Sequence, residues 1–220
     1  MRAAFLVAAK DLRVEGRTRD LVNAMLLLAL LVLAVGLVAY HDLHERAVVA
    51  SGVLWTAVVF ASALASARSF ANERDRGTLD VLLGAPADRG DIFLGKTIAH
   101  ATLLLAVETA VLPLYAWLSP DLGGVALGTL AVIAVLATVG LAAAATILAA
   151  VATAARAREA LVPVLLLPVA MPVVISAIHA TTAAFEGAGL SEVAGEAALL
   201  AGFAIIVLAL GWYLFEEVVA

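Results

Sequence analysis

Charged residues divide the chain into six long apolar stretches. The stretches cover residues 21–40, 47–67, 97–118, 124–153, 160–182 and 196–216. Each can cross a hydrocarbon core of about 30 Å as a helix, because an α-helix rises about 1.5 Å per residue. No stretch shows the alternation over about 10 residues that is typical of membrane barrel strands. The pattern therefore predicts an all-α integral membrane protein with six transmembrane helices in a single membrane domain, 1–220.

Composition supports this prediction and limits the function. Hydrophobic residues make up 65% of the chain and charged residues 14%, against about one half and one quarter in soluble domains. Six spans leave only short loops, so there is no room for a folded ATPase, kinase or receptor domain. The chain has no cysteine, which excludes thiolate metal sites and covalent haem attachment.

Basic residues predict the direction of the spans. Twelve of the 13 Lys and Arg residues fall before the first span, between the second and third, or between the fourth and fifth; Arg46 alone falls on the other side. Cytoplasmic loops carry an excess of Lys and Arg. We therefore expect both termini to lie in the cytoplasm.

Residues 1–19 precede the first span and show apolar residues at helical spacing. We expect an interfacial helix there, with one face toward lipid and Lys10, Arg13 and Arg17 toward water. The apolar residues expected on the lipid side are Phe5, Leu6, Ala8, Ala9 and Leu12. The alternative is a basic anchor that only sets topology.

The loop 68–96 contains signals for a short helix. Thr78 is a good N-cap, and the leucines that follow form one apolar face. These leucines are Leu79, Leu82 and Leu83. Gly84 and Pro86 would end the helix. So short a helix is not stable alone in water, so we expect it to dock on the protein's own helices or on a cytoplasmic subunit.

The same loop resembles the signature loop of ABC-2 type transporter permeases. The matching residues are Glu73, Arg74, Gly77, Thr78, Leu79, Leu82, Leu83, Pro86, Arg89, Gly95 and Lys96. The resemblance implies a six-span permease with an N-terminal elbow helix. It also implies that the loop is a coupling helix inserted into a separate ATP-hydrolysing subunit.

Within that superfamily the chain is most similar to the haem exporter B subunit (CcmB) family of cytochrome c maturation. Lys96 and His100 resemble the family's K-x-x-x-H, and residues 166–175 resemble its L-P-x-x-x-P-x-x-I. This implies a role in haem export or delivery in the inner membrane of a prokaryote. It implies as partners a CcmA-like cytoplasmic ATPase, which binds the ATP, and CcmC-like haem-handling subunits, with haem as a possible substrate. Nothing in the basic clusters indicates nucleic acid.

Residues 90–97 match the P-loop pattern G-x-x-x-x-G-K-T. A P-loop follows a strand and wraps phosphates with small residues. Here Asp91, Ile92, Phe93 and Leu94 fill the interior, and a membrane span follows. We interpret the match as false and expect no enzymatic activity in this chain.

Two polar residues of the third span are candidates for a polar or substrate path through the membrane. Glu108 lies mid-span, where a charge costs roughly 2.5 kcal/mol or more, so a functional role is as reasonable as a protonated carboxyl bonded to Thr or Tyr on a neighbouring helix. His100 lies eight positions earlier. It either contacts a ligand or extends toward the membrane surface as a structural residue.

Two further features have structural or functional interpretations. His41 and His44 are weak metal candidates in the loop 41–46. Pro168 and Pro172 in the fifth span are either a hinge or a static kink. The main alternative function is a generic ABC-2 exporter of lipid, glycan or drug, and a non-transporting assembly scaffold is another.

Overall fold

The computed structural model describes residues 2–39, 46–75, 77, 84, 88–118, 124–152 and 158–218. All of its elements in these ranges are helices. They are α1 (Arg2–Thr18), α2 (Asp20–Ala39), α3 (Arg46–Asp75), α5 (Arg89–Leu118), α6 (Leu127–Ala152), α7 (Arg158–Phe185) and α8 (Ala194–Val218). The predicted all-α membrane class is confirmed.

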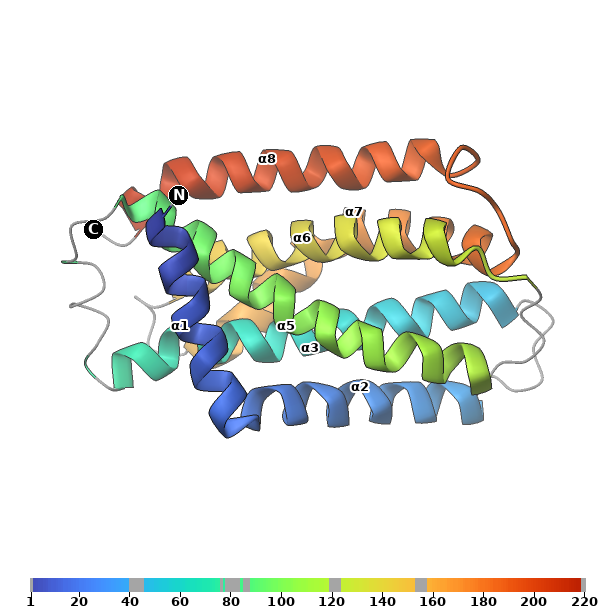
Figure 1. Ribbon diagram of the computed structural model, residues 1–220, viewed down its shortest axis with the longest axis horizontal. Helices are drawn as coiled ribbons and strands as arrows, with labels where there is room; N and C mark the ends of the chain where they lie inside the picture. The colour runs from blue at the N-terminus through green and yellow to red at the C-terminus, as the bar shows by residue number, and fades with distance from the viewer. Residues whose placement is uncertain are drawn as a thin grey trace.

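Five described helices are long and apolar enough to span a membrane, and the bent pair α1–α2 raises the number to six. The long helices run side by side, and the start of α1 and the end of α8 lie at the same end of the bundle (Figure 1). This arrangement agrees with an even number of crossings.

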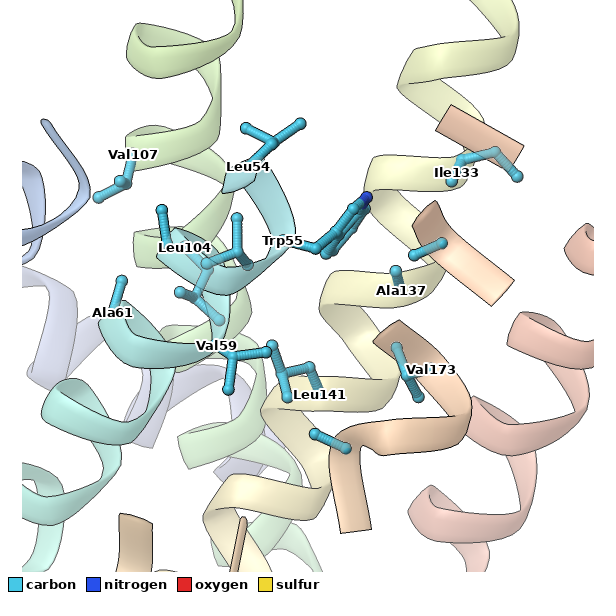
Figure 2. Packing of buried hydrophobic residues seen from close by; sticks show 14 of the residues in the cluster. Leu54, Trp55, Val59, Ala61, Leu104, Val107, Ile133, Ala137, Leu141 and Val173 are labelled. Atoms are coloured by element: carbon cyan, nitrogen blue, oxygen red, sulfur yellow. The ribbon is translucent and has the colours of Figure 1, made fainter. Parts of the chain in front are cut away.

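α6 forms the centre of the bundle. It contacts α3, α5, α7 and α8, and 67% of its most apolar window is buried, against 28% for α7 and 22% for α8. Its run Ala142–Ala145 is at most 1% exposed, because alanine lets neighbouring helices approach closely. Figure 2 shows Trp55 of α3 extending toward Ile133 and Ala137 of α6. The long exposed side chains of α2, α7 and α8 are left to face lipid.

A sharp turn separates α1 from α2. Arg19 has a left-handed backbone, with φ of 57°, and the two helices meet at 74°. The Glu15 carboxylate accepts a hydrogen bond from the Val22 backbone N–H at 2.8 Å, which caps the first turn of α2. α1 therefore crosses the end of the bundle obliquely (Figure 1), as expected for an elbow helix.

The buried face of α1 differs from the prediction. Ala4, Val7 and Ala8 are buried, and α1 packs on α5. Ala8 was expected to face lipid with Phe5, but Phe5 is 71% exposed while Ala8 is 3% exposed. The reason is that the small residues of α1 allow a close contact with α5. An amphipathic pattern shows which face of a helix is apolar, but it does not show whether that face packs on protein or on lipid.

The helices on each side of the predicted loop 68–96 extend into it. α3 continues to Asp75, and α5 already begins at Arg89. The Asp88 carboxylate accepts a hydrogen bond from the Gly90 backbone N–H at 2.7 Å, so Asp88 is the N-cap of α5. The predicted coupling helix around Thr78 lies outside the described residues.

Candidate functional site: a charge ring at the base of the predicted coupling loop

The last turn of α3 brings Glu73 against α1 and α5. Lys10 donates a hydrogen bond to Glu73 Oε1, and Lys96 Nζ lies 3.1 Å from Glu73 Oε2. Asp11 completes the arrangement, with Oδ1 3.0 Å from Lys10 Nζ and Oδ2 3.2 Å from Lys96 Nζ. Each lysine thus contacts both carboxylates. We call these four residues the charge ring.

Burial increases across the ring from Lys10 to Lys96. The side chains of Lys10 and Asp11 are 47% and 23% exposed, whereas those of Glu73 and Lys96 are 9% and 1% exposed. Partial burial opposes the charge of Lys10. The hydrogen bond to Glu73 and the negative charge of Asp11 outweigh it, so the pKa of Lys10 is raised above its usual range. Burial of a lysine side chain such as that of Lys96 is costly unless carboxylates pair with it.

A glycine makes this contact of α1 and α5 possible. A Cβ at Gly95 would lie 2.6 Å from the Ala4 carbonyl oxygen and 2.7 Å from the Val7 Cβ. Any side chain at this position would push α1 away from α5. The same separation would move Lys10 and Asp11 away from Lys96, so the closeness of the two helices is a condition for the ring.

The start of α5 is also fixed to the end of α8. Arg89 donates to the Glu216 carbonyl oxygen at 3.1 Å, near the helix C-terminus where a cation is favourable. The rings of Phe93 and Phe215 lie 5.8 Å apart between centroids. The predicted loop is therefore followed by a segment held on both sides, by α1 and by α8.

These contacts explain the P-loop match without a phosphate. Residues 90–97 are helical rather than a loop after a strand, so their backbone N–H groups cannot wrap an anion. Gly90 accommodates the Trp212 ring, whose Cδ1 would lie 1.6 Å from an added Cβ. Lys96, the residue that would hold a phosphate, is paired with Asp11 and Glu73.

The structure describes only part of the predicted coupling set. Glu73 is in the charge ring, and Gly77 has a positive φ of 64°, a conformation that glycine adopts readily. The side chain of Arg74 and all of the remaining residues lie outside the description. These remaining residues are Thr78, Leu79, Leu82, Leu83 and Pro86.

His100 and Glu108 both point into the bundle but at separate places. His100 is 6% exposed, and its Nε2 lies 3.3 Å from Ser62 Oγ on α3. Of the two interpretations of His100, extension toward the membrane surface is wrong, because the ring is buried against a serine on the facing helix. Glu108 accepts a hydrogen bond from Thr138 on α6 at 2.5 Å, one of the partner types anticipated.

The proline and histidine candidates have less support. α7 is one continuous helix through Pro168 and Pro172, and both prolines lie on its exposed side, which suits a static irregularity. His41 and His44 lie outside the described residues. Within the described ranges, no group of three His, Cys, Asp or Glu residues could hold a metal ion.

Sequence reasoning did not find the charge ring. The amphipathic pattern of residues 1–19 predicts that Lys10 faces water, and no sequence pattern marks Asp11 or Lys96 as a partner of Glu73. Lys10 and Glu73 are separated by 63 positions along the chain, and Asp11 and Lys96 by 85. A weak signal was present, since Lys96 precedes the third predicted span directly and a lysine at that position needs a partner when buried.

The fold and this site define a multi-pass, all-α membrane protein in which a charge ring joins α1, α3 and α5. Residues 2–219 match the family described as CcmB protein. The chain therefore belongs to the CcmB family, whose members are permease subunits of haem exporters in cytochrome c biogenesis. Individually curated proteins give no match.

Proposed function

We propose that this chain is the membrane subunit through which a separate cytoplasmic ABC ATPase of the CcmA type drives haem export or delivery. In this proposal it works beside CcmC-like haem-handling subunits in the inner membrane of a prokaryote, with both termini in the cytoplasm. Family membership supports the haem-related role. The exposed apolar surface of α2, α7 and α8 is its contact with membrane lipid.

The charge ring is the observation that supports coupling. Glu73 is the first residue of the loop motif and lies two residues before the end of α3 at Asp75. Its carboxylate contacts Lys10 of α1 and Lys96 of α5. A movement of the loop is therefore passed to two helices at once, one of which continues through the membrane.

The residues proposed to couple the chain to the ATPase extend from the ring into the loop. They are Glu73, Arg74, Gly77, Thr78, Leu79, Leu82, Leu83 and Pro86. The leucines would enter an apolar groove of the ATPase, and Glu73 would pass the movement on. ATP hydrolysis belongs to the partner, because Lys96 of the P-loop match is committed to carboxylates.

Copurification tests the coupling. Leu82→Asp and Leu83→Asp place a charge on the docking face, so a C-terminally tagged chain should lose the ATPase while still accumulating in the membrane. Leu82→Met is the matched control, because it keeps an apolar side chain of similar volume. Full copurification of the ATPase with both aspartate variants would show that this loop is not the docking element.

Cytochrome content tests the haem-related role separately. Deleting the chain should remove c-type cytochromes, and the intact chain should restore them. Normal c-type cytochromes in the deletion strain would instead favour a generic exporter of lipid, glycan or drug.

A further inference from the structure

A carboxyl group lies in the interior of the bundle, and one of its oxygens has no hydrogen-bond partner among the described residues. Glu108 is 4% exposed, and Thr138, its hydrogen-bond donor, is fully buried. Glu108 Oε2 is also buried and has no hydrogen-bond partner among the described residues. In the same ranges no lysine or arginine forms an ion pair with Glu108.

Glu108 borders a small cavity between α3, α5 and α6. The cavity has a volume of about 10 Å³, which is close to the least space that one water molecule needs. The other lining residues are Leu54, Trp55, Val58, Leu112, Leu130 and Ala134. The Trp55 indole N–H is already donated to Thr181 at 3.0 Å. Glu108 is the one residue with a carboxyl group among those that line the cavity.

The neighbouring helices offer no compensating charge. The described residues of α6 include no ionisable side chain, and neither does α3 from Ala47 to Ala67. His179 of α7 is exposed, and His100 lies eight residues before Glu108 on α5, about 12 Å along the helix axis, against Ser62. The other charged groups of α2, α5 and α8 lie near their helix ends. A carboxylate in such a place lacks the partner that burial of a charge requires.

The geometry also limits the ligand that this site can take. A metal cation needs several oxygen ligands, but the cavity wall is apolar apart from Glu108. A proton needs one oxygen. When Oε1 accepts from the Thr138 hydroxyl, the proton belongs on Oε2, the oxygen with no partner.

We infer that Glu108 and Thr138 form a proton-binding site inside the membrane bundle, loaded in this conformation and opened to water when α3 separates from α5 and α6. The Oε2–H bond then breaks, its electron pair stays on Oε2, and the proton passes to an entering water molecule; the reverse step reloads the site. This inference rests on the proposed function, to which it adds a proton step inside the bundle.

The conformation itself supplies the reason for exchange. A buried donor without an acceptor costs roughly 1–3 kcal/mol, so the protonated Oε2 favours any state in which water reaches the cavity. Thr138 holds Oε1 in both states, and its hydroxyl would stabilise the carboxylate while the proton is away. The site is therefore poised between a closed neutral form and an open hydrated form.

Infrared spectroscopy tests the site directly. The full chain, with whatever subunits copurify with it, is placed in lipid bilayers, and its spectrum is compared with that of Glu108→Gln in H₂O and D₂O. The wild type should show the carbonyl band of a protonated acid that shifts in D₂O and is missing from the variant. Thr138→Val should move the same band, because Oε1 loses its donor. This second variant keeps the test decisive if Glu108→Gln fails to accumulate.

Each infrared outcome decides the inference. Absence of the band in the wild type means that Glu108 is ionised, and a band that never responds to D₂O means that it is a fixed structural acid; both overturn the inference. A band that exchanges, and exchanges faster when ATP is supplied to the assembled complex, supports it.

A cellular test separates this site from the ATPase contact. Glu108→Gln should keep membrane level and ATPase copurification but reduce c-type cytochromes to the background of cells without the chain. Thr109→Val, a substitution at the exposed neighbouring position, is the control and should behave as the wild type. Full cytochrome levels with Glu108→Gln would overturn the inference, whereas loss of ATPase copurification would instead place the defect in the coupling element.

Discussion

The two buried glutamates of this chain lie in opposite surroundings. Glu73, at the end of the bundle, contacts two lysines and belongs to a ring of four charges. Glu108, in the interior, has one threonine hydroxyl and an apolar cavity. The difference shows two ways of burying a carboxyl group: two lysines balance its charge at the end of the bundle, and a single hydroxyl hydrogen bond holds it in the interior.

The largest expected effect comes from breaking the charge ring. Glu73→Ala leaves the buried Lys96 with Asp11 as its partner in the charge ring, and removing one member of a buried pair costs about 3–5 kcal/mol. We expect a clear fall in the midpoint of thermal unfolding in detergent. Glu217→Ala on the exposed end of α8 is the control. An equal, small effect of both variants would mean that the ring does not hold α1 and α5 to α3.

Disrupting the packing of α5 against α8 should have the next largest effect on stability. A Cβ at Gly211 would lie 2.2 Å from Cζ of Phe93, which is fully buried, so Gly211→Ala should cost about 1–3 kcal/mol of the unfolding free energy. Gly202→Ala on the same helix has open space around it. It should be neutral or stabilising by up to about 1 kcal/mol. Equal unfolding free energies for Gly211→Ala and Gly202→Ala would contradict the close contact between Gly211 and Phe93.

The Thr138 hydroxyl contributes less, because it makes one hydrogen bond within the membrane bundle. Thr138→Val should cost about 0.6 kcal/mol, the average for such bonds, in the same unfolding measurement. A loss as large as that of Glu73→Ala would show that Glu108 carries a charge, and would remove the contrast between the two regions.

Replacing Lys10, the most exposed member of the charge ring, should have the smallest effect on stability. Lys10 is half-exposed, and exposed ion pairs contribute about 0.2–1 kcal/mol. Lys10→Ala should therefore lower stability slightly, and the difference from the wild type should shrink as salt is added. Lys96→Ala, at the buried corner, should be several times more damaging and insensitive to salt.

Much of the fold could be predicted from the sequence. Charges mark the ends of the apolar stretches because a bilayer excludes them, so the long apolar helices and the presence of α1 could be inferred from residue types alone. The helix ends were less accessible. α5 begins at Arg89 rather than near Thr97, because Asp88 caps it, and because Gly90 and Lys96 are buried by partners far away in the chain.

The candidate site was predicted only where local chemistry was sufficient. A lone glutamate in an apolar span indicates a buried carboxyl with a hydroxyl partner, and Glu108 has one. The ring depends on contacts between α1, α3 and α5, which periodicity cannot specify. His100 shows the same limit, since its burial depends on Ser62 of another helix.

The close packing of α1 on α5 at Gly95 also has a consequence for biosynthesis. Asp11 and Lys96 are separated by 85 positions, so at roughly 5–20 residues per second the ribosome needs several seconds to supply the surface on which the first helix rests. During that interval α1 lacks its partner α5, and Lys10 remains available to lipid headgroups. α1 is thus made well before the surface on which it packs, and its docking reports that α5 has been inserted.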